Sequence, residues 1–222
     1  MKNILLFSVI MYTLTAMTAV KKPKIIFFGD SITEMATAKG GYIDRINSAL
    51  IKSKHRDAYE LTGAGISGNK VYDLYLRIDE DVLAKHPHTV VIYVGINDVW
   101  HKTMTGTGTD ADKFEKFYTA LIKKMQAKKI KVFVCTPSVI GEQKNNANQQ
   151  DEDLDIYAAL IKKAAAENNC GVIDLRNAFK EYESANNISN QSTGVLTTDG
   201  VHLNDAGNQL VAEKMMEALQ LP

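Results

Sequence analysis

Residues 89–94 read TVVIYV, a run dominated by β-branched side chains that ends at Gly95. Side chains of successive residues in a strand point to opposite faces, so this strand would be apolar on both of its faces. Such a strand is typical of the middle of a parallel sheet that helices cover on both sides. Residues 89–94 therefore indicate the central strand of an α/β fold.

On both sides of this run, short apolar stretches alternate with longer segments of helical periodicity. This alternation predicts βαβ units whose right-handed crossovers place helices on both faces of a parallel sheet. We therefore expect a three-layer α/β/α sandwich, and a single domain over residues 21–222. Strands are predicted at residues 25–28, 59–62, 89–94, 131–135 and 172–174, and helices at 42–51, 71–83, 111–126, 154–168, a short segment ending at 182, and 205–219.

The composition excludes several classes of protein. Of the 222 residues, 26 are Lys or Arg and 26 are Asp or Glu, so the formal net charge is zero. Proteins that bind nucleic acid or anionic membranes usually carry a basic excess, so neither partner is expected. Two cysteines, Cys135 and Cys170, are too few for a disulfide framework or a Cys-x-x-Cys zinc site. Cys135 ends one predicted strand and Cys170 precedes the next, so in parallel neighbouring strands they would lie roughly 13–17 Å apart. A disulfide needs Cα atoms within about 7 Å, and we therefore expect free, mostly buried thiols.

The first residues form a separate segment. Lys2 is followed by residues 4–20, which carry no charge, and then by Lys21 and Lys22. This pattern predicts a signal peptide over residues 1–20 and export to the periplasm or the medium, without stable membrane insertion after cleavage. The uncharged run is slightly short for a membrane span, which needs about 20 residues. An uncleaved anchor and a buried first strand are the alternatives.

Polar residues follow several of the predicted strands directly. Ser31 comes after the first strand, the loop at residues 63–68 after the second, and Asn97 after the third. Parallel strands place their carboxyl ends, and the functional loops that follow them, at one edge of the sheet. The loop at residues 198–204, before the last helix, should lie near the same edge.

A serine, a histidine and an aspartate among these residues could perform nucleophilic catalysis. Ser31 needs a base to become a good nucleophile. His202 could supply it, with Asp199, three residues earlier and separated by a glycine, orienting the imidazole as in a Ser-His-Asp relay. Alternatively, Ser31 caps a helix, His202 lies in a surface loop, and Asp199 caps the last helix.

Two neighbouring loops offer hydrogen-bond donors for the oxyanion of such a reaction. A glycine at position 68 could turn its backbone N–H toward the site. The side-chain amide of Asn97 is a neutral donor, which suits a tetrahedral oxyanion. Taken singly, Gly68 could reflect turn geometry and Asn97 a turn or a helix cap.

Four blocks together resemble the GDSL, or SGNH, hydrolase family. Residues 28–34 (FGDSITE) resemble its first block, 65–69 (GISGN) its second, 94–98 (VGIND) its third and 199–204 (DGVHLN) its fifth. The blocks keep the order of the family and extend over nearly the whole chain after residue 24. One departure is Asn69, where family members often carry aspartate, and it puts the hydrogen bonding of that loop in doubt.

The resemblance implies a fold and a set of roles. The family fold is an α/β sandwich with a five-stranded parallel sheet, in agreement with the periodicity. The resemblance implies Ser31 as nucleophile, His202 as general base and Asp199 as its orienting acid. The backbone N–H groups of Ser31 and Gly68 and the amide of Asn97 would form the oxyanion hole. Neither a metal nor an organic cofactor is implied.

Four further residues in or near these blocks are expected to bind substrate or to stabilise turns. Trp100 and His101 follow the third block and could line the substrate pocket, although a packing role for Trp100 is an alternative. Asp30 and Asp98 are interpreted as structural residues that hold their own turns through hydrogen bonds from side chain to backbone.

The sequence therefore predicts a serine esterase that works through an acyl-enzyme on carboxylic esters. By analogy with the family, the substrate would be a short-chain or acetyl ester on a carbohydrate. An acyltransferase or a lysophospholipase-type acylhydrolase is one alternative, and a catalytically inactive carbohydrate-binding homologue is another. The oligomeric state is not predicted.

Overall fold

Five parallel strands form the centre of the molecule, in the order β2-β1-β3-β4-β5. A computed structural model describes residues 22–222, so the signal peptide predicted at residues 1–20 lies outside the described residues. Each pairing between neighbouring strands is parallel. The strands are β1 (Lys24–Gly29), β2 (Glu60–Gly65), β3 (Thr89–Tyr93), β4 (Lys131–Cys135) and β5 (Gly171–Ile173).

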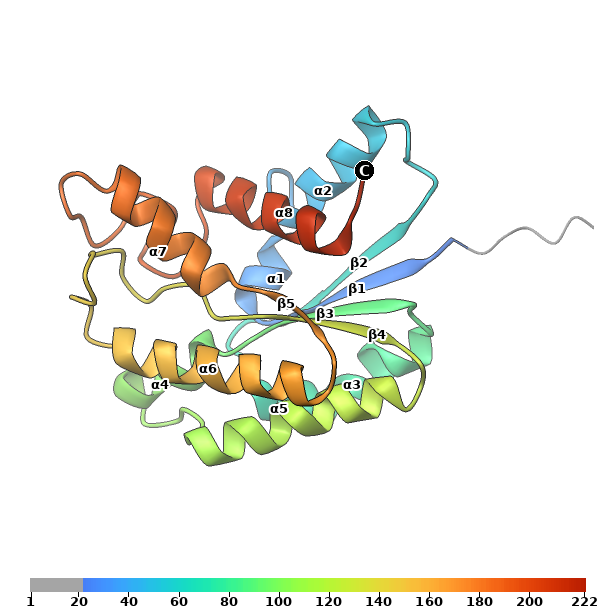
Figure 1. Cartoon of the computed structure of the whole chain (residues 1–222), viewed down its shortest axis with the longest axis horizontal. Coiled ribbons are helices and arrows are strands. Elements are labelled where there is room, and N and C mark those ends of the chain that lie inside the picture. Colours follow the sequence, from blue (N-terminus) through green and yellow to red (C-terminus); the bar gives the residue numbers. More distant parts are fainter. Residues whose placement is uncertain (1–21) are drawn as a thin grey trace, which may run out of the picture.

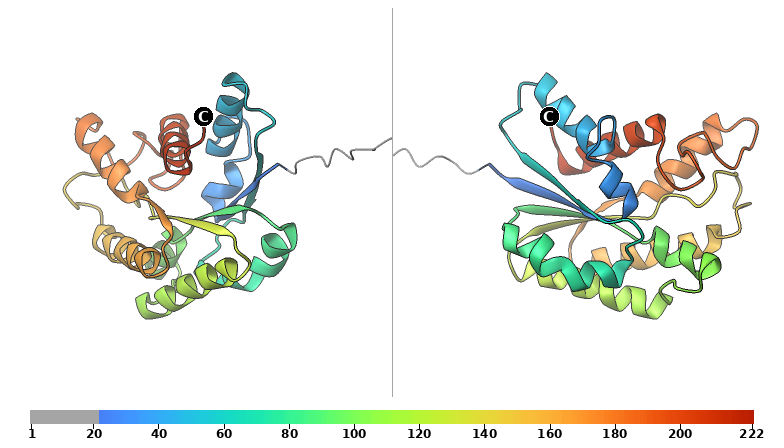
Figure 2. Two further views of the ribbon diagram at one scale, coloured as in Figure 1. Left: turned by 45° about the vertical axis from the view of Figure 1, so that its right-hand side comes forward. Right: turned by 180° about the vertical axis from the view of Figure 1, so that it is seen from behind.

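Helices cover both faces of this sheet, as Figure 1 and the two views of Figure 2 show. One face carries α1 (Ser31–Met35), α2 (Tyr42–Lys52), α7 (Leu175–Asn186) and α8 (Asp205–Leu219). The other carries α3 (Val71–Asp81), the short 3₁₀ turn η1 (Leu83–Lys85), α4 (Ile96–Met104), α5 (Ala111–Gln126) and α6 (Asp151–Glu167). The expected three-layer sandwich with a five-stranded parallel sheet is therefore confirmed.

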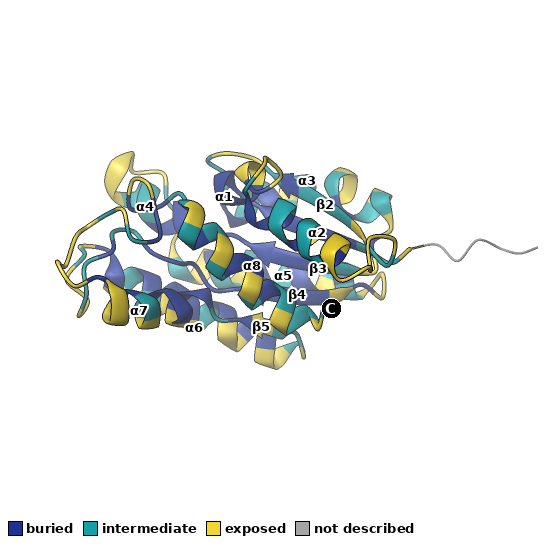
Figure 3. Ribbon diagram, turned by 90° about the horizontal axis from the view of Figure 1, so that it is seen from above, coloured by how far each residue is buried: buried dark blue, intermediate teal, exposed yellow. Residues whose placement is uncertain are grey.

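The core lies on the two faces of the middle strands. Val90, Val91 and Ile92 of β3 are fully buried, as are Phe27 and Phe28 of β1. Figure 3 shows the same pattern, with buried residues in the sheet and exposed ones on the outer faces of the helices. Strand β3 pairs with β1 on one side and β4 on the other, which confirms the central position expected from its apolar sequence.

Two helices at the carboxyl edge of the sheet were not predicted. Helix α1 has five residues, too few to show helical periodicity, and α4 follows β3 where the sequence suggested only a turn or a cap at Asn97. Contacts with distant residues hold α4 in place. The Asp98 carboxylate accepts the Val71 N–H, and the Asp98 carbonyl accepts the Thr109 N–H. Gly95, with φ of 134°, provides the sharp turn out of β3.

Both cysteines are free thiols, as expected. Cys135 ends β4 and pairs in register with Ile173, whereas Cys170 precedes β5, so the two lie three positions apart along neighbouring strands. Burial raises the pKa of the Cys170 thiol to about 11. Among the described residues, no helix is long and apolar enough to cross a membrane.

Glu183 of α7 is a buried carboxyl group whose ionisation should affect stability. It is only 4% exposed, and its Oε1 has no hydrogen-bond partner among the described residues. Burial, followed by the charge of Glu142, raises the pKa of Glu183 to about 8. In the unfolded chain a glutamate titrates near about 4.3. Between these two values the folded protein holds a proton that the unfolded chain has released.

Folding stability should therefore fall as pH rises through this window, and the loss should be complete above about pH 8. Glu183→Gln removes the titration while keeping a neutral group of the same shape. We expect the Tm of the variant at pH 9 to exceed that of the wild type by more than roughly 2–4 °C, the shift for about 1 kcal/mol in a chain of this size, because the two pKa values differ by more than the single unit that is worth about 1.4 kcal/mol. At pH 4 the two proteins should melt alike. An equal Tm difference at both pH values, measured by circular dichroism, would show that Glu183 does not titrate as described.

Candidate active site

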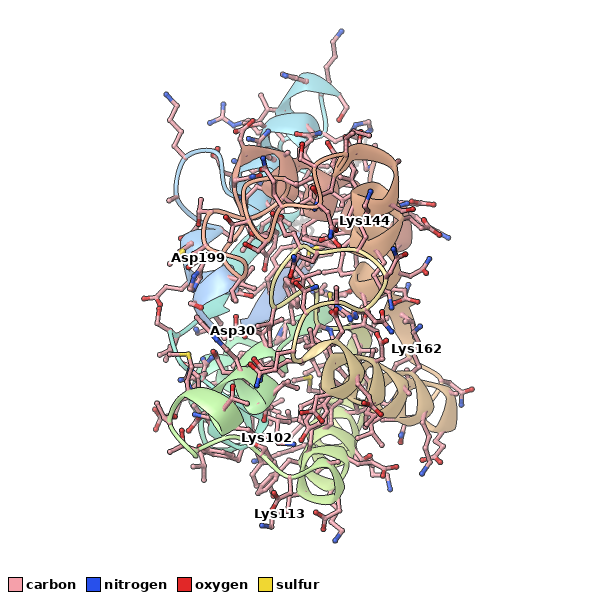
Figure 4. The ribbon with its side chains drawn as sticks, turned by 90° about the vertical axis from the view of Figure 1, so that its left-hand side faces the viewer. Asp30, Lys102, Lys113, Lys144, Lys162 and Asp199 are labelled. Atoms are coloured by element: carbon pink, nitrogen blue, oxygen red, sulfur yellow. The ribbon has the colours of Figure 1, made fainter. Side chains whose placement is uncertain are left out.

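The predicted site residues gather at the carboxyl edge of the sheet. Figure 4 looks onto this end of the molecule and labels Asp30, which follows β1, and Asp199, from the loop before α8. The loop after β2 and the first turn of α4 belong to the same edge, because they follow parallel strands that neighbour β1. The edge therefore collects residues from four separate parts of the chain.

Ser31 is held by a tight turn between β1 and α1. It is the first residue of α1, and Asp30 caps that helix by accepting the Ile32 N–H at 3.1 Å. A Cβ on Gly29 would lie 2.2 Å from the Tyr93 carbonyl oxygen and 2.3 Å from Oγ1 of Thr33. Only glycine can therefore occupy position 29 without moving β3 or α1. Ser31 is mostly buried, with 7% of its surface exposed.

Ser31, His202 and Asp199 are connected in series by hydrogen bonds. Oγ of Ser31 lies 3.0 Å from Nε2 of His202, and Nδ1 of His202 lies 2.7 Å from Oδ2 of Asp199. When Nδ1 carries its proton toward Asp199, Nε2 is free to accept the serine proton. The structure thus brings together the three residues that the sequence suggested as nucleophile, base and acid.

The loop of residues 199–202 is organised around the Asp199 carboxylate. Oδ1 of Asp199 accepts the backbone N–H of Val201 at 3.0 Å and that of His202 at 2.7 Å. Gly200, with φ of 95°, makes this tight turn possible. Burial by itself would raise the pKa of Asp199, but the hydrogen bonds from His202 and Val201 outweigh it and hold the pKa below its usual range. Asp199 therefore remains a carboxylate beside the imidazole.

The loop that carries Gly68 is fastened to α1. Glu34 accepts both the backbone N–H of Ser67, at 2.7 Å, and its hydroxyl group. The hydrogen bonds from Ser67 lower the pKa of Glu34, so the acceptor is charged. Gly68 itself has φ of 77°, a left-handed conformation that glycine adopts at little cost. The resulting turn is fixed against the same short helix that begins with Ser31.

Asn97 fastens the same loop to α4. Its side-chain Nδ2 donates to the Asn69 carbonyl oxygen at 3.1 Å, and the residue is 4% exposed. An amide nitrogen has two hydrogens, so one N–H of Asn97 is left for another acceptor. The sequence suggested a turn or cap at this position as one alternative; the structure instead places Asn97 within the first turn of α4.

Arg77 of α3 binds the loop that carries Gly68, and it shows how Asn69 is hydrogen-bonded there. Its Nε donates to Oδ1 of Asn69 at 2.7 Å, and its Nη2 donates to the carbonyl oxygens of Gly29 and Ala64 at 2.7 and 3.1 Å. The guanidinium also lies 4.5 Å from the centre of the Phe28 ring. One partly buried cation thus connects the ends of β1 and β2 with the loop that carries Gly68, and the side chain of Asn69 serves as one of its acceptors.

Asp30 and Asp98 are structural, but only Asp30 acts as expected. Asp30 holds its own turn, whereas Asp98 accepts the Val71 N–H with both carboxylate oxygens at 3.2 Å and so ties α4 to the start of α3. The prediction that Asp98 holds its own turn was wrong, because the buried Val71 N–H at the start of α3 needs an acceptor and Asp98 supplies it. Burial raises the pKa of each carboxyl to about 7, and in Asp30 the charge of Asp98 adds to this effect.

One aromatic side chain of α4, Trp100, lies beside the imidazole of His202, and a second, His101, lies beside Trp100. The ring centre of Trp100 is 6.3 Å from that of His202, with the planes 68° apart, so the two rings meet edge to face. The His101 ring lies 6.0 Å from that of Trp100. Burial, with the charge of Lys70 adding to it, lowers the pKa of His101. His101 is therefore a neutral hydrogen-bonding group near neutral pH.

Three charged residues support the site but were not predicted to do so. They are Arg77, Glu34 and Glu142, whose carboxylate accepts the N–H groups of Val195, Leu196 and Thr197 just before Asp199. Each contacts residues far from it in the chain, and no local pattern marks such contacts. Among residues 22–222, no group of three or more His, Cys, Asp or Glu side chains is arranged to hold a metal ion.

A serine hydroxyl, an imidazole and a carboxylate connected in this way are the arrangement of the serine hydrolases. Residues 27–210 match the model of the GDSL-like lipase/acylhydrolase family. The chain belongs to this family, and it is a carboxylic ester hydrolase.

Three similar proteins carry related names. The crystal structure of an acetyl xylan esterase, AlAXEase, is 55% identical to this chain, covers 88% of it and 99% of that protein, and superposes with a TM-score of 0.88. An acetylxylan esterase of Geobacillus stearothermophilus is 28% identical, over 88% of this chain and 93% of its own. The crystal structure of LAE5, an alpha/beta hydrolase from the metagenome of Lake Arreo, Spain, is 27% identical, covers 89% of this chain and 95% of its own, and has a TM-score of 0.78.

Proposed function

We propose that this chain removes acetyl groups from acetylated xylan or xylo-oligosaccharides through an acyl-enzyme on Ser31. The observation that carries the proposal is the hydrogen-bonded series from Ser31 through His202 to Asp199. The names of the similar esterases support the substrate class, since AlAXEase and the Geobacillus enzyme are both acetyl xylan esterases. Variants of the Geobacillus enzyme in which a serine or a histidine is replaced by alanine are described as catalytic mutants.

The reaction proceeds in two halves. Oγ of Ser31 attacks the acetyl carbonyl carbon while Nε2 of His202 takes the hydroxyl proton. The tetrahedral intermediate collapses, the bond to the sugar oxygen breaks, and His202 passes its proton to that oxygen, which releases the sugar. A water molecule then attacks the acetyl-serine with His202 again as base, and acetate leaves with Ser31 restored.

Asp199 acts through His202 and does not contact the substrate. Its carboxylate fixes the tautomer with the proton on Nδ1, which leaves the lone pair of Nε2 toward Ser31. When the imidazole gains the serine proton, the charge of Asp199 stabilises the imidazolium. The two backbone N–H groups that bind the other carboxylate oxygen keep Asp199 in this orientation.

We assign three neutral donors to the oxyanion hole. They are the backbone N–H of Ser31, which as the first in its helix has no intrahelical partner, the N–H of Gly68 and the second amide N–H of Asn97. The bonds of Glu34 to Ser67 and of Asn97 to Asn69 hold two of these donors in place before substrate arrives. Donors positioned in advance need not reorganise when charge develops, which makes them effective.

Trp100 and His101 are placed to contact the sugar or the acyl group. Trp100 borders the ring of His202, the residue that passes its proton to the leaving group. An indole face packs well against the apolar side of a pyranose ring, and the neutral imidazole of His101 can exchange hydrogen bonds with sugar hydroxyls. We therefore assign these two residues to substrate binding.

Asn97→Ala should lower kcat by about 10²–10³-fold, the usual loss when one side-chain donor is removed from an oxyanion hole. KM should change little, because the donor is needed mainly in the transition state. Steady-state kinetics with p-nitrophenyl acetate measure both values. Asn186→Ala, which alters an exposed asparagine whose side chain donates to the Tyr182 carbonyl one turn earlier in α7, is the matched control. A kcat for Asn97→Ala equal to that of the control would remove Asn97 from the oxyanion hole.

Acetate release from acetylated xylo-oligosaccharides tests the proposed substrate. We expect the purified protein to release acetate, to leave the xylose backbone intact, and to prefer p-nitrophenyl acetate over esters of long acyl chains. A preference for long chains would favour a lysophospholipase-type activity. Transfer of acetyl to an added alcohol in place of water would identify an acyltransferase. Binding of the oligosaccharide without acetate release would identify an inactive binding protein.

We further propose that residues 1–20 are a signal peptide and that residues 21–222 form the exported single-domain enzyme. The charge pattern of the first residues supports this, as an apolar run between Lys2 and Lys21 fits a secretory signal. Export would bring the enzyme to polymeric xylan outside the cell. N-terminal sequencing of the protein from the periplasm or the medium should find Met1 removed; a secreted protein that retains Met1 would contradict the proposal.

A further inference from the structure

Glu142, in the loop between β4 and α6, is fully buried and binds three consecutive backbone amides. One carboxylate oxygen accepts the N–H of Val195 at 2.8 Å. The other accepts the N–H groups of Leu196 and Thr197 at 2.5 and 2.7 Å. These amides belong to the segment that leads directly into Asp199 and His202. Hydrogen bonds from N–H groups to a charged carboxylate are stronger than those to neutral acceptors.

The segment held by Glu142 forms the base of the loop that carries Asp199 and His202. Thr197 pairs with Leu203 in an isolated antiparallel bridge, which closes the loop between them. Within the loop, Oγ1 of Thr197 accepts the Gly200 N–H at 3.0 Å, and the N–H of Thr198 donates to the His202 carbonyl at 2.8 Å. The position of residues 195–197 therefore determines where the side chains of Asp199 and His202 point.

Gly141, the residue before Glu142, binds the loop that carries Asp199 and His202 at Gly200. The N–H of Gly141 donates to the Gly200 carbonyl at 2.8 Å, and the N–H of Glu142 donates to the Ser192 carbonyl at 2.9 Å. Position 141 has φ of 89°, so the turn that allows this approach suits glycine. Residues 141–142 thus hold the loop on both sides of Asp199, which itself is half exposed and has few other supports.

Glu183 is a second buried carboxyl group near Glu142. Glu183 lies close enough for the charge of Glu142 to raise its pKa, which reaches about 8 with burial as the larger cause. At neutral pH Glu183 therefore keeps its proton. Three N–H groups donate to Glu142, so both of its carboxylate oxygens have hydrogen-bond partners.

We propose that Glu142 is a positioning residue for the reaction: by holding the amides of Val195, Leu196 and Thr197 it sets the orientation of Asp199 and His202 toward Ser31. The proposal rests on the proposed esterase function for its kinetic test. Glu142 itself touches neither substrate nor reacting atoms. A purely structural role would change stability but leave the turnover of the folded molecules intact.

The test compares Glu142→Gln with Glu183→Gln. In Glu142→Gln an amide NH₂ replaces one acceptor oxygen and faces an N–H donor, so the segment must shift. Glu183→Gln changes a neighbouring carboxyl that is already neutral and serves as the matched control. Turnover of p-nitrophenyl acetate is measured at pH 7 per active site, with active sites titrated by a fluorophosphonate. Circular dichroism and thermal melts check folding in both variants.

We expect Glu142→Gln to lower kcat by about 10–100-fold with little change in KM, since a small misplacement of a catalytic group can cost about 10²-fold. Glu183→Gln should keep the wild-type values. If Glu142→Gln fails to fold, Glu142→Asp takes its place, with a shorter side chain of the same charge and a smaller expected loss. Wild-type kcat in a folded Glu142 variant, even with a lower Tm, would overturn the proposal.

A second readout does not depend on turnover. The proton on Nδ1 of His202, shared with Asp199, should give a downfield NMR signal in the wild type and in Glu183→Gln. The signal should weaken or shift in Glu142→Gln. A protein without esterase activity that still shows this difference would contradict the proposed function but support the positioning role. Identical signals in all three proteins would overturn the positioning role.

Discussion

Ser31→Ala should abolish ester hydrolysis, with kcat falling by about 10⁴–10⁶-fold, the range found when the nucleophile of a Ser-His-Asp relay is removed. The hydroxyl that lies 3.0 Å from Nε2 of His202 is the atom that forms the acyl-enzyme, and alanine leaves nothing in its place. Kinetics with p-nitrophenyl acetate measure the loss. The fold should be intact, because the variant removes one oxygen and leaves the Asp30 cap of α1 in place.

Ser53→Ala is the matched control for this variant. Ser53 follows the last residue of α2 and is exposed, and its hydroxyl group contacts only the nearby Leu50 carbonyl and the ring of His55, both far from the site. Exposed substitutions of this kind usually change stability by less than about 0.5 kcal/mol, so activity should equal that of the wild type. Equal activities of the Ser31→Ala and Ser53→Ala proteins would refute Ser31 as nucleophile.

Asp199→Asn should lower kcat by about 10³–10⁴-fold, close to the effect of the same change in other Ser-His-Asp enzymes. The asparagine amide would offer a donor where Nδ1 of His202 now meets an acceptor at 2.7 Å. The imidazole would then carry its proton on Nε2, which could no longer take the proton of Ser31. Binding of substrate should be retained, so the loss should fall on kcat and leave KM nearly unchanged.

The matched control is Asp205→Asn at the start of α8, where an exposed aspartate pairs with Arg45. Exposed ion pairs contribute little, so this variant should keep wild-type kinetics. Proton NMR gives a further check, because the His202 tautomer should differ between the two variants. Asp199→Asn with more than about one tenth of wild-type kcat would mean that His202 does not need its carboxylate, in conflict with the relay.

Much of the edge where these residues meet could be predicted from the sequence. The run at residues 89–94 indicated a central parallel strand, and β3 occupies that position. Because parallel strands end at one edge, residues after separate strands could be expected to converge there. The contacts of Ser31 with His202 and of His202 with Asp199 agree with this expectation.

The supports of the site could not be predicted, because they depend on contacts between distant residues. Glu142 occurs in a polar loop and resembles any solvated glutamate, yet it is fully buried against three amides from another loop. Arg77 looks like a surface residue of an amphipathic helix, yet it bonds to the carbonyl of Gly29. The sequence of α4 suggested only a turn, because the contact between Asp98 and Val71 that holds this helix joins distant residues.

Peptide mapping of the protein quenched during turnover tests whether Ser31 carries the acyl group. The purified enzyme is mixed with acetylated xylo-oligosaccharides or p-nitrophenyl acetate, stopped with acid, digested and analysed by mass spectrometry. We expect one acetyl group on the peptide that contains Ser31, and none on that peptide in Ser31→Ala. Acetyl groups found on another residue, with Ser31 unmodified while acetate is released at the full rate, would contradict this expectation.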